Sequence, residues 1–362
     1  MDNAELETVQ DVPPLEKLAC SIHVVTSPTS RSKRFQQFMN LVRGRSHSLS
    51  SYDSMEMQKT VDTLLAQDRY DAVLFESALI AGCRVPHGVE VNIDQHNIEH
   101  ELLERTYRHE KAGLRKWYSW LESRLLKGQE LERCARAAQV LVTSERERVL
   151  LKSMLPESVI EVVPNGVDID AFQAISSRQE VAGRITFIGT MHYYPNVDAV
   201  LSFAQKCWPL IRAKVPDATW QIVGHDPLPE VQRLAQLPGV TVTGSVPDVR
   251  SYLAASEVVI APLQVGSGTR LKILEALAMQ KAVVTTSLGC EGLSVESGEH
   301  LIVADQPGAF AQAVIALLHN PEMRVTYGTA GRKLVEAEYS WERCGTKMLH
   351  VLEELEGRML IW

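Results

Sequence analysis

The stretch VVIAPLQVGSGTRLKILEALAMQKAVVTT (residues 258–286) predicts a strand, a glycine-rich turn, an amphipathic helix and a second strand. The runs VVIAP (258–262) and AVVTT (282–286) are almost continuously apolar, as strands buried on both faces usually are. Helix-length segments separate similar runs along most of the chain. This alternation predicts an α/β fold built from parallel sheets with helices on both faces.

The alternation divides into two units of comparable size. PNGVDID (164–170) is rich in turn residues and ISSRQEVAG (175–183) is polar and aperiodic, so we expect the boundary near 164–183. A long helix is expected over 195–215. The predicted strands cover residues 22–25, 72–76, 89–93, 139–143 and 159–163 in the first unit, and 185–189, 220–224, 240–244, 258–262, 282–286 and 301–305 in the second.

The composition indicates an ordinary soluble protein. The 362 residues are 45% hydrophobic and 23% charged, with a net charge of −8, which argues against a general nucleic-acid binder. No run is long and apolar enough to span a bilayer, and the acidic start lacks a secretory signal pattern. The six cysteines are scattered and form no C-x-x-C pair, which favours a cytoplasmic protein with reduced thiols.

Two cations stand at an unexpected place. Arg270 and Lys272 lie at the start of the predicted helix, where the helix dipole repels positive charge. A phosphate bound by the free N–H groups of the helix start would match both charges. The alternative is a plain strand-to-helix turn with two solvated bases. Glu275, among apolar residues of the same helix, is expected to be partly buried and to pair with Lys272 or with ligand hydroxyls.

The chain resembles a known family at several motifs in matching order. These are GSGTRLKILEALAMQKAVVTT (266–286), VVPNGVDIDAF (162–172), FIGTMHYYPNVDAV (187–200), VTSERER (142–148), IAPL (260–263), CEGL (290–293) and YSW (339–341). Together they resemble the retaining glycosyltransferases of the GT-B class, family four. The resemblance implies two Rossmann-like domains that face each other across a cleft: an acceptor-side domain over 1–172, a nucleotide-sugar-binding domain over 173–341, and a C-terminal helix over 342–362 that crosses back.

The resemblance also implies roles for individual residues. Glu275 matches the glutamate that holds the ribose hydroxyls. Val246, in GSVPD (244–248), matches the region that meets the base. His96, in IDQHNIE (93–99), matches a cleft histidine near the transferred sugar. The match implies a catalytic role, in which His96 hydrogen-bonds a sugar hydroxyl or stabilises developing charge, although a lone histidine after a strand is more often a loop or core residue. The loops that meet the diphosphate and the sugar match Gly189, Thr190, Gly266, Ser267, Gly268 and Thr269.

Three departures from the family pattern qualify these roles. Ser267 stands where many members have a glutamate, and MHYYPN (191–196) lacks the arginine and lysine that many members place after the first glycine loop. We therefore expect Arg270 and Lys272 to supply the missing charge and to stabilise the departing diphosphate, which gives both a catalytic role. The usual first strand, glycine-rich turn and helix are also not recognisable. Either the first domain is shortened, which would expose an edge of its sheet, or its start has diverged beyond recognition.

The expected ligands are a nucleoside diphosphate sugar as donor and a saccharide or lipid-linked acceptor. No metal or other cofactor is expected, because the histidines have no ligand spacing and the fold class requires no divalent ion.

LRKWYSWLESRLLKG (114–128) is basic and aromatic. It is expected either to lie on an anionic membrane at the inner face or, as we favour, to pack on the first domain with its tryptophans in the core. The sequence does not indicate the oligomeric state.

Two other functions compete with sugar transfer. A non-catalytic nucleotide-sugar-binding protein of the same fold would explain the shortened front. A nucleotide-sugar epimerase is a weaker alternative, because the motif set argues against it. Transfer assays separate the first two functions, and product identity separates the third.

Overall fold

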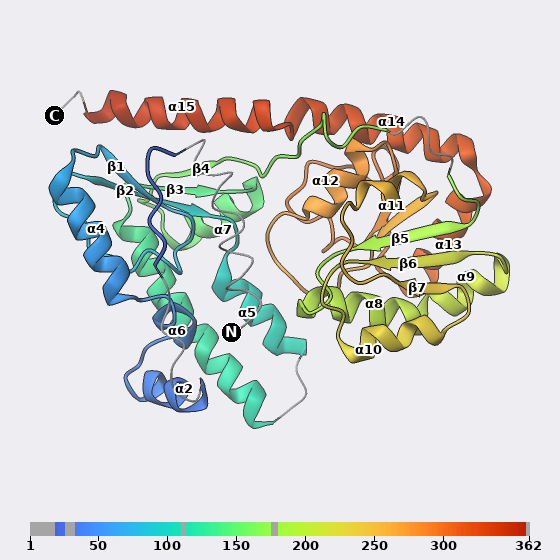
Figure 1. The fold of residues 1–362 in the computed structure, drawn as a ribbon, viewed down its shortest axis with the longest axis horizontal. Coiled ribbons are helices and arrows are strands. Elements are labelled where there is room, and N and C mark those ends of the chain that lie inside the picture. Colours follow the sequence, from blue (N-terminus) through green and yellow to red (C-terminus); the bar gives the residue numbers. More distant parts are fainter. Residues whose placement is uncertain (1–18, 26–32, 110–112, 175–179, 360–362) are drawn as a thin grey trace.

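A computed structural model describes residues 19–25, 33–109, 113–174 and 180–359 of the chain. Within these ranges the strands form two fully parallel sheets, one in each half of the chain. Figure 1 shows the two sheets side by side, each with helices packed around it. The α/β class with two parallel sheets is confirmed.

The first unit has four parallel strands in the order β1-β2-β3-β4. Its strands are β1 (Ala72–Phe75), β2 (Glu90–Gln95), β3 (Gln139–Val142) and β4 (Ile160–Val162). Its helices are α2 (Lys33–Val42), α3 (His47–Ser50), α4 (Met55–Gln67), α5 (Glu99–His109), α6 (Leu114–Arg136) and α7 (Glu145–Met154). Among the described residues no strand precedes β1, which is therefore an edge of this sheet.

The second unit has six parallel strands in the order β10-β9-β8-β5-β6-β7. Its strands are β5 (Arg184–Ile188), β6 (Thr219–Val223), β7 (Val240–Val242), β8 (Val258–Ala261), β9 (Ala282–Thr285) and β10 (Ile302–Val303). Its helices are α8 (Tyr194–Lys206), α9 (Trp208–Lys214), α10 (Pro229–Gln232), the 3-10 turn η1 (Arg233–Gln236), α11 (Arg250–Ala254), α12 (Leu271–Ala278), α13 (Pro307–His319) and α14 (Pro321–Glu338).

Strand β8 shows how the second sheet is buried on both faces. Val258 and Ile260 belong to the apolar cluster that includes residues of α8, α9 and α13, whereas Val259 and Ala261 belong to the cluster that includes residues of α11, α12 and α14. Side chains alternate between the faces of a strand, so a continuous apolar run supplies both clusters. The apolar runs of the sequence therefore predicted these strands well.

Two predictions of local structure were wrong. Residues 22–25 form no strand, and His23 and Val24 in this stretch are exposed. The helix expected over 195–215 is two helices, α8 and α9, which divide at Cys207. Pro209 follows two residues later, and a proline cannot donate the backbone hydrogen bond that a continuous helix requires.

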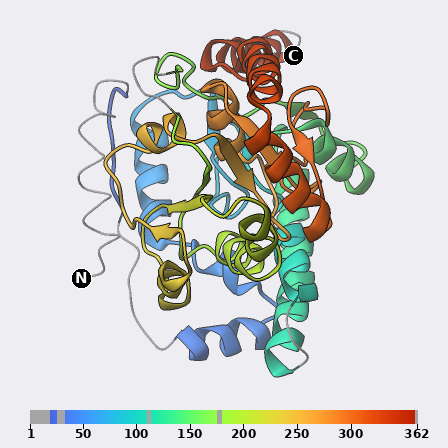
Figure 2. The same cartoon turned by 90° about the vertical axis from the view of Figure 1, so that its right-hand side faces the viewer.

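Helix α15 (Trp341–Met359) follows α14 and extends beside the first sheet, as Figures 1 and 2 show. At the junction, the backbone N–H of Val167 donates to the carbonyl of Tyr339 at 2.8 Å. A cavity of about 340 Å³ is lined by Ser144, by Gly292 and by Lys347 of α15, so this junction borders both units. The domain limits 1–172, 173–341 and 342–362 stay predictions.

Candidate functional site

The topology of the second sheet puts both predicted glycine loops at one place. The chain runs from β5 to β6 and β7, then returns to β8 on the other side of β5. In open parallel sheets, ligands bind at such a reversal, beyond the carboxyl ends of the strands. The loops that leave β5 and β8 contain Gly189 and residues 266–269, so both loops lie at the reversal.

Lys272 reaches from the first turn of α12 to the loop after β5. Its Nζ donates to Asn196 Oδ1 at 2.7 Å and lies 4.3 Å from the centre of the Phe187 ring. A β-carbon on Gly189 would lie only 2.7 Å from this nitrogen. Burial, together with the charge of Arg270, lowers the pKa of Lys272 to about 7. The charge of Lys272 therefore depends on its surroundings at neutral pH.

Arg270 is the N-cap residue of α12, and its guanidinium folds back over the glycine loop. Its Nη1 donates to the carbonyls of Ser267 and Gly268, the latter at 2.6 Å. Its Nε and Nη2, and the Ser267 hydroxyl, are buried and have no hydrogen-bond partner among the described residues. Burial lowers the pKa of Arg270. Buried donors without acceptors are costly, so this loop is suited to receive an anion.

The other predicted donor residues lie around these cations. Thr190 Oγ1 is 3.1 Å from His225 Nε2, and its carbonyl accepts from the Asn196 amide at 3.0 Å. Glu275 makes no ion pair with Lys272 among the described residues, and burial raises the pKa of its carboxyl. Val246, after β7, packs half-buried against the apolar cluster beneath α12, and Thr269 is half-buried before Arg270. Their contacts with a ligand stay predictions.

His96 comes from the first unit, directly after β2. Its Nε2 lies 3.1 Å from Glu76 Oε2, and its Nδ1 lies 3.8 Å from Asp94 Oδ1. Burial raises the pKa of Asp94, and the neighbouring His96 partly offsets this effect. These three side chains sit at the carboxyl ends of β1 and β2, which is the edge where an α/β sheet binds ligands.

The same segment touches the glycine loop of the second unit. The carbonyl oxygen of His96 lies 2.9 Å from a β-carbon built on Gly268. The Asn97 amide, oriented to donate, reaches the carbonyls of His96 and Ser267 at 3.2 and 3.1 Å. The structure therefore brings His96 close to the loop that precedes Arg270.

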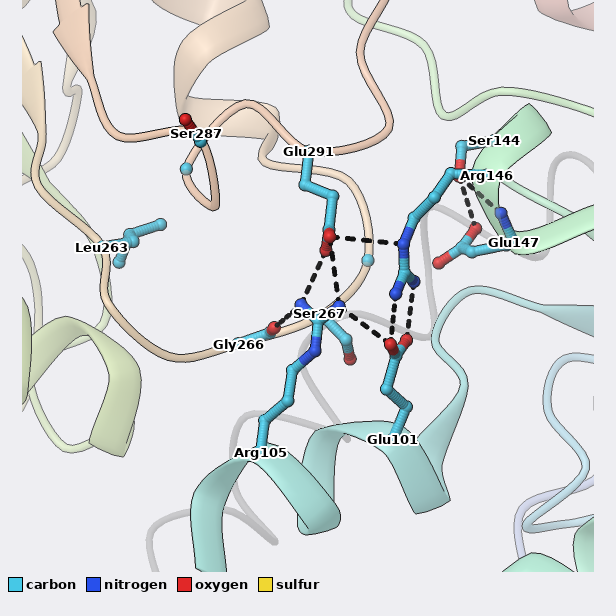
Figure 3. Close-up of polar contacts among 12 residues, drawn as sticks. Glu101, Arg105, Ser144, Arg146, Glu147, Leu263, Gly266, Ser267, Ser287 and Glu291 are labelled. Carbon is cyan, nitrogen blue, oxygen red and sulfur yellow. Dashed lines mark hydrogen bonds and ion pairs between the residues drawn. The ribbon is translucent and has the colours of Figure 1, made fainter. Parts of the chain in front are cut away.

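A second connection between the units is charged, and Figure 3 shows it. Arg105 of α5 donates to the carbonyl of Gly266 at 2.9 Å and to both carboxylate oxygens of Glu291 at 2.6 and 3.1 Å. Arg146 of α7 pairs with Glu101 and lies 3.3 Å from Glu291. Two arginines of the first unit thus hold a carboxylate of the second, and one of them also fixes the glycine loop.

Four residues of the site were not predicted from the sequence: Arg105, Glu291, Asn97 and Asn196. Arg105 and Glu291 are 186 residues apart, so no local pattern links them. Glu291 lies within CEGL (290–293), one of the motifs of the family resemblance, but the motif itself indicates no role for this carboxylate. The available signal for Arg105 was its helical spacing from Glu101, four residues earlier, which marks an ion pair but not its partner in the other unit.

Two family models match the chain. The model described as "Glycosyltransferase Family 4" matches residues 15–171, and the model described as "Glycosyl transferases group 1" matches residues 182–320.

Several of the curated proteins that match the chain are named mannosyltransferases, and two others are named as uncharacterised. The phosphatidyl-myo-inositol mannosyltransferase of Mycobacterium leprae is 28% identical over 205 residues, 53% of this chain and 52% of the relative. The GDP-mannose-dependent alpha-(1-6)-phosphatidylinositol monomannoside mannosyltransferase of Mycobacterium tuberculosis is 27% identical over 221 residues, 54% of this chain and 56% of the relative. The chain thus spans about half the length of these relatives.

Solved structures share the fold over nearly the whole chain. The sucrose-phosphate synthase of Thermosynechococcus elongatus has a TM-score of 0.70 at 18% identity, over 87% of this chain and 80% of that one. Anabaena HepE, solved in complex with UDP-glucose, has a TM-score of 0.65 at 15% identity, over 96% of this chain and 88% of that one. The expected GT-B architecture is confirmed.

The lowered pKa of Lys272 predicts a pH dependence of stability. Between pH 7 and about 10.5, the unfolded chain keeps this proton and the folded chain does not, so the free energy of unfolding rises with pH. The contribution approaches about 1.4 kcal/mol per pH unit. Urea unfolding at pH 7 to 9.5 should show a smaller rise for Lys272→Met than for the parent protein.

The exposed Lys333 on α14 supplies the matched control, and Lys333→Met should keep the slope of the parent protein. Equal slopes for all three proteins would show that Lys272 titrates as an ordinary lysine.

Proposed function

The chain belongs to the GT-B glycosyltransferases of group 1 and family four, and from this membership we propose that it transfers a sugar from a nucleoside diphosphate sugar to an acceptor. The supporting observation is the pair of cations at the start of α12. Arg270 and Lys272 lie beside two glycine loops at the reversal of the sheet, and neither forms an ion pair with a carboxylate among the described residues. A diphosphate would satisfy both.

The positions of Arg270 and Lys272 suit the departure of a diphosphate from the donor sugar. As the bond between sugar and diphosphate breaks, negative charge grows on the leaving phosphate oxygen. Arg270 Nε and Nη2, together with protonated Lys272, would stabilise that charge from positions fixed before the reaction. Glu275 would accept hydrogen bonds from the ribose hydroxyls. No metal-bound step is needed in this scheme.

His96 would act at the other side of the reacting sugar. Its pairing with Glu76 orients the imidazole ring, and its backbone lies against the loop that holds the diphosphate. We propose that it hydrogen-bonds a hydroxyl of the transferred sugar and that the anomeric carbon keeps its configuration. This retention follows the resemblance of the chain to retaining family members.

A cavity of the first unit favours a lipid-linked acceptor over a free saccharide. It has a volume of about 720 Å³ and lies beside β1 and β2, with Phe75 and Ile93 in its apolar wall. Its polar side has four arginines and two carboxylates, and each carboxylate pairs with one of the arginines, which leaves Arg45 and Arg84 in excess. The apolar wall suits a lipid chain, and the excess of arginines at the rim suits an anionic headgroup. The mycobacterial relatives are named for phosphatidylinositol acceptors.

Helix α6 supports contact with a membrane surface. Leu114, Trp117 and Trp120 are 88%, 55% and 39% exposed, so these tryptophans do not lie in the core as the favoured packing interpretation required. Arg124 lies over the Trp120 ring, 5.7 Å from its centre. None of the described helices is long and apolar enough to cross a bilayer. We propose peripheral attachment at the inner membrane face, with α6 as the contact.

Nucleotide binding tests the proposed cations. Calorimetric titration with nucleoside diphosphates should show tight binding by the parent protein and binding weakened about tenfold to a hundredfold in Arg270→Ala and in Lys272→Ala, because each variant loses charge-assisted hydrogen bonds. Arg233→Ala, at an exposed position of η1, should bind like the parent protein. Unchanged binding by both variants would rule out the proposal that Arg270 and Lys272 bind the diphosphate.

A transfer assay tests the reaction and the acceptor. Donor sugars are incubated with lipid-linked and free saccharide acceptors, and NMR compares the anomeric configuration of donor and product. We expect transfer to the lipid-linked acceptor with retention. An inverted product would contradict the retaining mechanism. Nucleotide binding without transfer to either acceptor would favour the non-catalytic alternative, and an altered free nucleotide sugar would favour the epimerase.

Sedimentation with vesicles tests the membrane contact. The parent protein should sediment with vesicles that contain anionic lipid and much less with neutral ones. Replacing Trp117 and Trp120 by alanine should lower the partition coefficient about tenfold or more, since each large side chain contributes roughly 1.5 kcal/mol or more when buried. Trp341→Ala, which removes an exposed tryptophan from α15, is the matched control. Equal sedimentation with both vesicle types would exclude the contact.

A further inference from the structure

Three metal-ligating side chains meet at the carboxyl ends of β5 and β6. His192 follows β5, and His225 and Asp226 follow β6. Asp226 Oδ2 lies 3.0 Å from His225 Nδ1 and 3.6 Å from His192 Nδ1. One ligand atom from each residue lies within 4.8 Å of the other two. Two imidazoles and one carboxylate thus converge at one point.

The backbone holds this arrangement. Gly224 permits the two loops to touch, because a β-carbon at that position would overlap the carbonyl oxygen of Gly189. Met191 N–H then donates to the His225 carbonyl at 2.9 Å, and Leu228 N–H donates to the Met191 carbonyl at 3.3 Å. Asp226 has a φ of +52°, a left-handed conformation that few residues other than glycine adopt, although asparagine, aspartate and histidine adopt it more often than the rest. The position of its carboxylate is therefore set by a constrained turn.

Hydrogen bonding suits His225 to a metal ion. Its Nε2 lies 3.1 Å from Thr190 Oγ1, which can accept the proton of that nitrogen. In that tautomer the lone pair of Nδ1 faces Asp226 Oδ2, 3.0 Å away, and an ion between these two acceptors would replace the hydrogen bond that Nδ1–H donates to the carboxylate in the other tautomer. Metal-binding histidines commonly donate their second ring N–H in this way, and the bond fixes both tautomer and ring orientation.

We propose that His192, His225 and Asp226 bind one divalent transition-metal ion. Imidazole and carboxylate ligands suit ions such as Zn²⁺, Co²⁺ and Mn²⁺. Ligand atoms about 2.1 Å from a tetrahedral ion lie about 3.4 Å apart, and the two measured separations of 3.0 and 3.6 Å bracket that spacing. All three side chains are exposed, so an ion can enter and keep an open coordination position.

The position of this site gives the ion a role, and this step rests on the proposed function. Thr190, which bonds His225, belongs to the loop expected to meet the diphosphate. That loop carries no arginine or lysine over residues 189–196. An ion held by His192, His225 and Asp226 would place positive charge where the loop has none and could accept a phosphate oxygen. The sequence predicted no metal because its histidines lack a ligand spacing; the fold supplies the proximity instead.

Co²⁺ titration of protein first stripped with a chelator tests the site. Its visible spectrum reports nitrogen and oxygen ligands, and a thiolate ligand would add an intense near-ultraviolet band, which separates this site from the cysteines. We expect one ion per chain without that band. His192→Ala, His225→Ala and Asp226→Asn should each weaken binding at least about tenfold. Asparagine tolerates the left-handed backbone of position 226, so Asp226→Asn removes only the charge.

His319→Ala, at an exposed position of α13, is the control and should bind Co²⁺ like the parent protein. Absent binding, a thiolate spectrum, or equal affinity in the three site variants would overturn the metal site and leave an exposed histidine pair hydrogen-bonded to an acid.

A second titration tests whether the bound ion interacts with the nucleotide, separately from whether the ion binds at all. A saturating nucleoside diphosphate should tighten Co²⁺ binding to the parent protein, and the metal should tighten nucleotide binding by the same factor, because such coupling is reciprocal. Asp226→Asn should lose this coupling and still bind the nucleotide. Co²⁺ binding that the nucleotide leaves unchanged would overturn the role beside the diphosphate. Co²⁺ binding by a protein that binds no nucleotide would instead overturn the proposed function.

Discussion

The donor site depends on how the ammonium group of Lys272 is held. It lies at a helix start, where the dipole is unfavourable, and it pairs with a neutral amide and the face of an aromatic ring instead of a carboxylate. These contacts come from α8 and β5, so the side chain joins three elements at the reversal of the sheet. A cation in such surroundings loses solvation without gaining a counter-charge, which is why its pKa falls to about 7. An anionic ligand is the missing partner.

Residues from both halves of the chain form the binding site for that ligand. Arg105 reaches from α5 to the carbonyl of Gly266, and Asn97 reaches the carbonyl of Ser267. The glycine loop therefore takes its conformation partly from the first unit. Glu291 fixes Arg105 in turn, and both arginines of this network have carboxylate partners. Their charge is thus neutralised locally, and it is Arg270 and Lys272 that keep positive charge available for a donor.

The sequence predicted those features that repeat locally. Apolar runs such as 258–262 predicted the inner strands β8 and β9 because every residue of these two strands is buried. The run 22–25 failed because apolar residues form a strand only where a neighbouring strand and a core receive them. Arg270 and Lys272 were found because their position conflicts with the helix dipole. His192 and His225 were missed because only the strand order places the loops after β5 and β6 side by side. Arg105 and Glu291 were missed because only the contact between the two units brings them together.

Besides Arg270, the donor site has two proposed sources of positive charge, and both are conditional. Lys272 gains or loses its proton near pH 7, and the metal ion would bind or leave at His192, His225 and Asp226. Without an anion the two charges repel each other across the loop at 189–190, so each disfavours the other. A diphosphate between them would reverse that relation, because it attracts both. The proton on Lys272, the metal ion and the donor are therefore expected to bind cooperatively. Without the donor, either cation binds weakly, because the buried charge of Arg270 already repels it.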